Sequence, residues 1–335
     1  MILNFDQYAQ QEDAEMKKKK TEKKQRNNKT SKSEKVVPLF DNRAAEETLA
    51  EISKLIGERE FASEDELRAF LQEMLDTDES PETSPGTPLE QAQDLIYEAW
   101  ESSSRSRRTE LAAKALAISG DCADAYAILA QETANSLEEA KNLYELGVKA
   151  GDRALGPEVF EEDAGHFWGI LTTRPYMRAR AGLAECLWQL GEYDKAIEHY
   201  FEMLRLNPGD NQGIRYELMN CLLDGGFDEA AGKLLKQHED DGAATCLYSR
   251  ALWMFRREGA TEKAKACLRE ALKRNPFVPP YLLGKKKLPR YLPEYYSWGD
   301  ENEAIGYAIE AIRAWKKTKG ALEWLATHLA SYHKE

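Results

Sequence analysis

The chain has 335 residues, with 46 lysines and arginines against 59 aspartates and glutamates, which gives a formal net charge of −13. Hydrophobic residues make up 42 % and charged residues 31 %, a composition typical of a soluble protein with long exposed helices. No stretch approaches the roughly 18 apolar residues of a membrane span. Asp6 interrupts any secretory signal, and the five cysteines form no CxxC pair. We therefore expect a cytoplasmic protein without a disulfide framework.

The N-terminal segment is strongly basic. Residues 17–35 hold ten lysines and arginines and two glutamates, with no aliphatic or aromatic side chain. Such a stretch buries too little apolar surface to offset its chain entropy, so we predict a disordered basic arm over residues 1–37. It could be a solubilising tail, or a contact for nucleic acid or an acidic partner. No aromatic residue interleaves the lysines to stack a base.

The next segment is acidic, and residues 38–76 are predicted to form a short acidic helical pair. In the first helix, Leu49 and three further apolar residues up to position 56 share one face. In the second helix, Ser63 and Glu66 have the spacing of a capping box. A linker rich in proline, serine and threonine follows over residues 77–88.

A period of 34 residues organises the chain from residue 89 to residue 278. Glycines stand at positions 191, 225 and 259, and alanines at positions 196, 230 and 264. A glycine fits the turn between two helices, where a positive φ is favoured, and an alanine fits the point where the two helices come closest. Three clear units over 177–278 and two looser units over 89–154 predict about five helix pairs, with an insertion at 155–176.

These glycine and alanine positions resemble the tetratricopeptide repeat. The resemblance is strong at 177–210 and 245–278 and fair at 211–244. It implies an all-α fold, a right-handed superhelical solenoid of tetratricopeptide-like helix hairpins with a concave inner face.

The C-terminal segment departs from the repeat, and residues 279–335 are predicted to form a proline-rich turn and capping helices. Its pattern of proline, glycine, acidic and aromatic residues resembles the end of the suppressor-of-tumorigenicity-seven family, over roughly residues 110–325. That resemblance implies a scaffold or regulator without established catalytic residues. The membrane segments that family members carry upstream have no counterpart here, so no membrane partner is expected. The residues that carry the resemblance are Asn275, Pro276, Val278, Pro279, Leu282, Leu283, Gly299, Asp300, Glu303, Ala304, Ile305, Tyr307, Ala308, Trp315, Lys316 and Gly320 to Leu322.

Residues that could perform chemistry are sparse. None of the five histidines lies in a metalloprotease motif or beside a nucleophile, and no phosphate-binding loop is present. His166, within GHFWG and close to the acidic run 161–163, could line a ligand pocket, or this loop could simply plug the array. We predict no enzyme activity, no catalytic residue, no metal and no cofactor. A further hypothesis for the function is an enzyme or metal protein built on His166.

In a tetratricopeptide array, positions 2, 5, 9, 12 and 13 of each first helix line the concave face. Tryptophan and arginine dominate interface energetics, and arginine binds carboxylates in a bidentate manner. We therefore predict a groove for an extended or helical peptide with acidic and aromatic anchors. The alternative is that the indole rings turn into the helix stack and the arginines pair with nearby glutamates. The predicted groove residues are Arg178, Trp188, Gln189, Arg215, Trp253, Arg256 and Arg257.

The sequence thus predicts a non-enzymatic protein–protein interaction scaffold or adaptor that binds a peptide or partner helix. The alternative function is a nucleic-acid or ribosome-associated factor that uses the basic arm as a sequence-independent phosphate contact.

Overall fold

The computed structural model describes residues 43–59, 61–76, 86–289, 293 and 296–332. Every regular element within these ranges is a helix, so the predicted all-α fold class is confirmed. The predicted basic arm (1–37) lies outside the described residues, as does most of the predicted linker (77–88).

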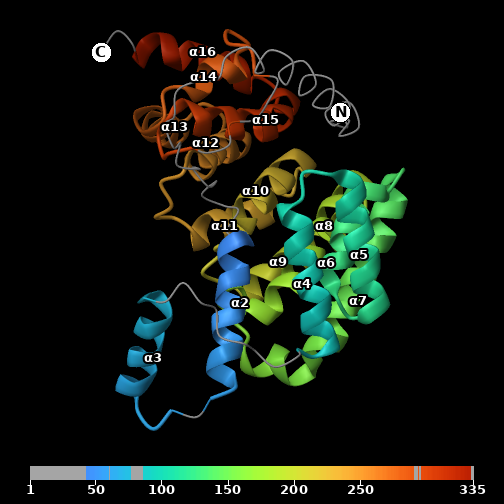
Figure 1. Cartoon of the computed structure of the whole chain (residues 1–335). Coiled ribbons are helices and arrows are strands. Elements are labelled where there is room, and N and C mark those ends of the chain that lie inside the picture. The colour runs from blue at the N-terminus through green and yellow to red at the C-terminus, as the bar shows by residue number, and fades with distance from the viewer. Residues whose placement is uncertain (1–42, 60, 77–85, 290–292, 294–295, 333–335) are drawn as a thin grey trace, which may run out of the picture. The chain divides into compact units, whose positions relative to one another are not determined.

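Five helix hairpins follow one another between residues 88 and 274, as the 34-residue period predicted (Figure 1). In each hairpin the second helix packs against the first. We call the surface formed by the first helices of the hairpins the first-helix face. The pairs are α4 (Pro88–Glu101) with α5 (Arg105–Ile118), α6 (Ala123–Thr133) with α7 (Leu137–Glu162), α8 (Arg174–Gln189) with α9 (Tyr193–Leu206), α10 (Ile214–Gly225) with α11 (Asp228–Gln237), and α12 (Ala244–Glu258) with α13 (Glu262–Arg274).

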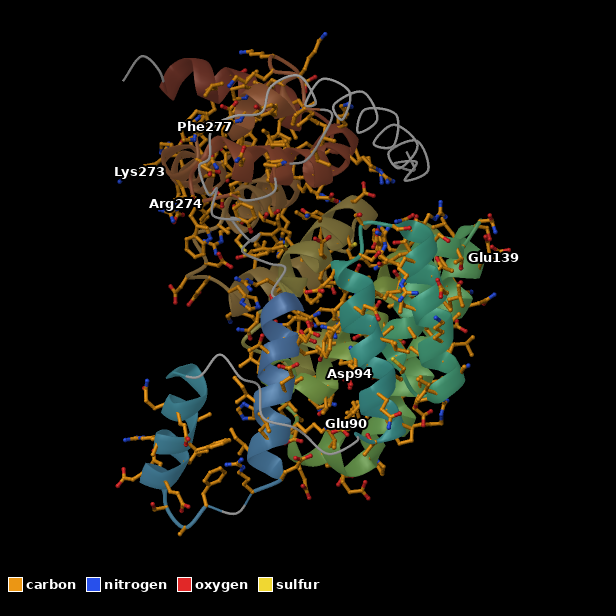
Figure 2. All side chains as sticks on the ribbon, in the orientation of Figure 1. Glu90, Asp94, Glu139, Lys273, Arg274 and Phe277 are labelled. Atoms are coloured by element: carbon orange, nitrogen blue, oxygen red, sulfur yellow. The ribbon has the colours of Figure 1, made fainter. Side chains whose placement is uncertain are left out.

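The hairpin array starts at a strong helix cap. The Thr87 hydroxyl accepts from the Glu90 N–H at 3.3 Å, and the Glu90 carboxylate accepts from the Thr87 N–H at 2.6 Å. Pro88 fits the first helical position because its missing N–H has no partner there in any case. Figure 2 labels Glu90 on α4. Hydroxyl groups cap later helices in the same way, at Ser104, Ser136 and Thr261.

Two helices precede the array, α2 (Arg43–Gly57) and α3 (Glu64–Asp76). The capping box expected at the second is present, since Ser63 Oγ accepts from the Glu66 N–H at 3.2 Å. The Glu66 carboxylate in turn accepts from the Ala62 N–H at 2.8 Å. The apolar residues expected on one face of the first helix differ in burial, since Leu49 is 45 % exposed and Leu55 is 5 % exposed.

The middle repeat is shifted by one residue from the predicted register. The residue with positive φ in its turn is Gly226 (φ 82°), not Gly225. A Cβ on Gly225 would lie 2.6 Å from the Phe227 ring, so this glycine is required by close packing rather than by its φ. The extra residue moves the fully buried alanine of α11 from Ala230 to Ala231. The other two repeats keep the predicted register.

The 155–176 segment closes the end of the α8–α9 hairpin. Gly156, at φ 72° and followed by a proline, interrupts the helical backbone of α7. Two short 3₁₀ turns then lead into α8, η1 (Phe167–Gly169) and η2 (Leu171–Thr173). The Phe167 ring is fully buried, 5.2 Å from the Phe160 ring and 6.2 Å from the Tyr176 ring. The aromatic residue of the GHFWG loop is therefore part of the core.

Three C-terminal helices complete the fold, α14 (Val278–Leu282), α15 (Glu301–Lys317) and α16 (Ala321–Tyr332). Helix α15 packs against α10 and α12, two first helices. Its Tyr307 ring lies 5.7 Å from the Tyr248 ring of α12, and its fully buried Trp315 donates to the Tyr307 hydroxyl at 2.9 Å. Cys246 and Ser249, two groove positions of α12, are buried in this region. The chain's own helix therefore covers the first-helix face at its C-terminal end.

Candidate functional site

The structure divides the seven predicted groove residues between two places. Trp188, Trp253, Arg256 and Arg257 stand near the C-terminal ends of α8 and α12, around the α10–α11 turn, and Gln189 follows Trp188. We call the surface around this turn the turn-edge site. The two remaining residues lie nearer the opposite ends of their helices and are described after it.

An aromatic cluster forms one side of the turn-edge site. The Trp188 ring lies 4.5 Å from the Tyr193 ring and 6.4 Å from the Phe227 ring. Gly225 brings the backbone of the turn against this indole, since a Cβ there would lie 2.8 Å from Trp188. Tyr193 is 43 % exposed and covers the outer side of the cluster. Trp188 therefore packs between neighbouring hairpins, and Tyr193 presents an aromatic surface to solvent.

The second indole is held by one hydrogen bond and by a cation. Trp253 Nε1 donates to the Asp228 carbonyl oxygen at 2.7 Å, and the Arg257 guanidinium lies 4.8 Å from the Trp253 ring centroid. Arg256 donates to the Leu223 carbonyl oxygen at 2.6 Å and pairs with the Asp228 carboxylate at 3.2 Å. Arg256 thus stabilises the α10–α11 turn, whereas Arg257 is exposed.

A hollow of about 510 Å³ opens beside these residues. Its charged lining includes Arg256, Lys317 and Lys319, opposed by Asp224 and Asp228. The Asp224 carboxylate is paired with Lys317 at 2.7 Å. An anionic group that entered this hollow would meet Arg256, Lys317 and Lys319. The full lining is Leu223, Asp224, Gly225, Gly226, Asp228, Phe255, Arg256, Gly259, Lys317, Thr318 and Lys319.

Arg215 has its charge satisfied within the array. Its guanidinium donates to the Asp210 carboxylate and to the Asp241 carboxylate, both at 2.7 Å. Those bonds connect the loop before α10 and the loop before α12 through Arg215. Next to it on α10, Met219 and Leu222, two further groove positions, are fully buried. Arg215 therefore has the contacts of a structural residue.

Arg178 is enclosed by carboxylates from two other helices. It donates to Asp124 of α6, with Nε at 2.7 Å from Oδ1, and to Glu46 of α2, with Nη2 at 2.9 Å from Oε1. Burial alone would lower the pKa of Arg178, but the charges of Asp124 and Glu46 raise it above its ordinary value. The alternative was that the arginines pair with nearby glutamates. Arg178 does pair with Glu46, whereas Arg215 and Arg256 pair with aspartates.

The sequence did not reveal three carboxylates that face one another across α8, α10 and α15. They belong to Glu185, Glu217 and Glu310, each open to solvent on one side. Loss of water around it, together with the charges of Glu310 and Glu185, raises the pKa of Glu217 to about 7. Glu310 reaches the other two carboxylates because α15 packs there, and α15 lies outside the repeat period.

Tyr193, Lys317 and Lys319 were also missed at the turn-edge site. Tyr193 follows the turn glycine by two positions and lies outside the five groove positions. Lys317 ends α15 and Lys319 follows it, so both lysines reach this site only because α15 folds back onto the array. The only signal in the sequence was the basic KKTKG stretch.

The described residues offer no cluster for metal binding. No group of three or more histidine, cysteine, aspartate or glutamate side chains among them could hold a metal ion. His166 is exposed at the start of η1, and the neighbouring buried ring is that of Phe167. Within the same ranges, no helix combines the length and hydropathy that crossing a bilayer requires.

Two protein families match parts of the chain. Residues 178–210 match the tetratricopeptide repeat family, and residues 253–334 match the ST7 protein family. Both resemblances drawn from the sequence are thereby confirmed at these segments. The second match includes α15 and α16, the helices that fold back onto the array.

Curated relatives carry the same family name. The suppressor of tumorigenicity 7 protein-like proteins of Bos taurus and Homo sapiens are each 27 % identical over 254 residues, which is 69 % of this chain and 45 % and 44 % of theirs. The ST7 homolog of Drosophila melanogaster is 25 % identical over 268 residues, 72 % of this chain and 49 % of its own. The chain spans about half the length of these relatives.

A solved structure with related architecture is that of YrrB, described as a TPR protein with an unusual peptide-binding site. It is 21 % identical, with a TM-score of 0.39, over 56 % of this chain and 84 % of that chain.

Proposed function

We propose that this protein is a non-enzymatic interaction scaffold that binds a peptide or partner helix at the turn-edge site. The observation that carries the proposal is the hollow of about 510 Å³ lined by the α10–α11 turn, together with the exposed ring of Tyr193 on the aromatic cluster that packs against the same turn. An array of helix hairpins offers a rigid frame on which such a surface can be held. The absence of catalytic activity and a cytoplasmic location remain predictions.

The proposed partner carries acidic and aromatic anchors. Lys317 and Lys319 are exposed cations that line the hollow, and Arg257 is an exposed cation on the Trp253 ring; charged hydrogen bonds to a carboxylate are stronger than neutral ones. An aromatic anchor would pack on Tyr193, because ring pairs add favourable energy beyond area burial. The partner cannot lie along α10 and α12, since α15 covers them. Of the predicted groove residues, Trp188, Gln189, Trp253, Arg256 and Arg257 stay in the proposal.

The test changes exposed residues only. Tyr193→Ala combined with Arg257→Glu removes the aromatic surface and reverses one charge, while leaving the Arg256 bond to the turn intact. Lys263→Glu on α13 is exposed and serves as the matched charge control. Affinity capture with quantitative mass spectrometry should show partners lost by the first variant and kept by the control, with unchanged circular dichroism. An unchanged partner set in the Tyr193/Arg257 variant would reject the site.

A second candidate function is nucleic-acid binding through residues 17–35. The ten lysines and arginines of that run favour it, since release of counterions from phosphates gives affinity independent of sequence. RNA binding by the full chain should then weaken steeply with salt. Deletion of residues 1–37 should abolish it, and salt-independent binding or binding that survives the deletion would contradict this function.

A further inference from the structure

Helix α2 inserts a carboxylate into the first-helix face. Glu46 is 3 % exposed although it belongs to a predominantly solvated helix. Its Oε2 lies 3.1 Å from Arg174 Nη1 and 3.1 Å from Arg178 Nη1, and its Oε1 lies 2.9 Å from Arg178 Nη2. One carboxylate therefore bridges two guanidinium groups of α8, more than 120 residues further along the chain.

The arginines that bind Glu46 also have partners outside α2. Asp124 of α6, 1 % exposed, binds Arg178 from the other side and accepts from the Gln93 amide of α4 at 3.0 Å. The Trp100 ring of α4 lies 4.8 Å from the Arg178 guanidinium. Arg174 is oriented in turn by its bond to the Trp168 carbonyl oxygen at 2.9 Å. Side chains of α4 and α6 thus fix Arg178, and the backbone of η1 fixes Arg174.

The ion-paired charges in this pocket balance when Glu46 is present. Arg174 and Arg178 bring two positive charges, and Asp124 compensates one of them. Glu46 supplies the other negative charge. A partly buried guanidinium without a partner carries a large desolvation penalty, so the pocket favours a carboxylate ligand.

The remaining contacts of α2 are few. Leu55 is buried at 5 % exposure, Ile52 is half-buried, and Leu49 is largely exposed. A 15-residue helix is marginal in isolation, so α2 depends on its contacts with the array. Figure 1 shows α2 beside α4, and Asp94, labelled on α4 in Figure 2, lies near Lys54 of α2. These features are those of a tethered ligand that another helix could replace.

We propose that the face formed by α4, α6 and α8 is a docking site for an acidic amphipathic helix, and that α2 occupies it until a partner helix displaces it. The partner carries a glutamate in its first turn and aliphatic residues six and nine positions later, as α2 does with Glu46, Ile52 and Leu55. This inference adds a second surface to the proposed scaffold and does not depend on the turn-edge site.

The experiment uses the full chain and a fluorescent synthetic peptide of residues 43–57. The peptide is expected to bind a Glu46→Lys chain about tenfold more tightly than the parent chain, because its own α2 no longer fills the pocket. Glu51→Lys makes the same charge change on an exposed position of α2 and should leave binding at the parent level. A peptide with E46Q should bind the Glu46→Lys chain about tenfold more weakly than the unaltered peptide.

A milder substitution tests the same contact if Glu46→Lys unfolds the chain. In a Glu46→Gln chain, hydrogen exchange should accelerate over α2 while the amides of α4 and α8 stay protected. Equal peptide binding by parent and Glu46→Lys chains, or undiminished binding of the E46Q peptide, would overturn the proposal. So would a parent dimer that dissociates on Glu46→Lys, since α2 would then lie on a second copy. Arg257→Glu should not alter peptide binding, which separates this site from the turn-edge site.

Discussion

Replacing Glu303 with glutamine should lower the free energy of unfolding by about 2–4 kcal/mol. The carboxylate is 6 % exposed and accepts three hydrogen bonds. The donors are the Ala244 N–H at 2.9 Å, the Asn275 side-chain amide at 2.8 Å and the Gly299 N–H at 2.7 Å. Glu303 therefore joins the start of α12, the end of α13 and the start of α15.

The magnitude follows from what glutamine removes. A hydrogen bond to a charged acceptor contributes roughly 1.5–3 kcal/mol, and leaving a buried donor without an acceptor costs about 1–3 kcal/mol. Glutamine keeps the shape of Glu303 but has a single acceptor oxygen, so at least one of the three N–H groups faces an NH₂ group. The other bonds become neutral and weaker.

Urea unfolding followed by tryptophan fluorescence measures this loss. Glu270→Gln on α13 is the matched control, because Glu270 is exposed and its replacement should change the free energy of unfolding by less than about 0.5 kcal/mol. A double-mutant cycle with Asn275→Ala should give a coupling energy of about 0.5–3 kcal/mol. If Glu303→Gln cost no more than the control, the carboxylate would not hold α15 on the array.

Three further experiments test the repeat register, the turn-edge site and the group of carboxylates around Glu217. Ala196→Leu should cost about 1–3 kcal/mol in urea unfolding by overpacking a fully buried position, whereas Ala230→Leu should cost clearly less; equal losses would contradict the register. Gly232→Ala would put a Cβ 2.5 Å from the Trp253 ring, so the indole must move and its emission should change; unchanged emission would refute this packing. Folding raises the pKa of Glu217 from 4.5 to about 7, so the folded state binds this proton more tightly than the unfolded state. The protonated carboxyl therefore contributes to stability fully below pH 4.5, and that contribution is lost as the pH rises to about 7. Glu217→Gln should therefore raise the Tm at pH 8 and not at pH 4; a Tm equal to that of the parent at pH 8 would count against it.

The sequence could predict features that repeat locally. The 34-residue period located the helix pairs, and it placed Trp188, Trp253, Arg256 and Arg257 on corresponding parts of their repeats. Those four residues do gather around one turn, because neighbouring hairpins stack with a constant offset. The one-residue shift at Gly226 was visible only as a double glycine, which fits either register.

The 34-residue period could not predict contacts between segments that are distant in the sequence. One partner of Arg178 is Glu46, 132 residues away, and nothing in the spacing of α2 indicates which first helix it approaches. The fold of α15 onto α10 likewise follows no repeat, so the burial of Met219 and the approach of Glu310 to Glu217 could not be foreseen. The repeat period predicts which hairpins are adjacent, whereas these contacts depend on where α2 and α15 pack on the array.

The return of α15 to α10 and α12 has a consequence for how the molecule comes apart. Tandem repeats that touch only their neighbours behave as one-dimensional chains and can fray one unit at a time. A helix that bridges two units links their melting, so the last two hairpins should open as one cooperative block. Proteolysis under native conditions would then release that block whole, while the α4–α5 hairpin, which has its own small cluster of buried side chains with α6, could open separately.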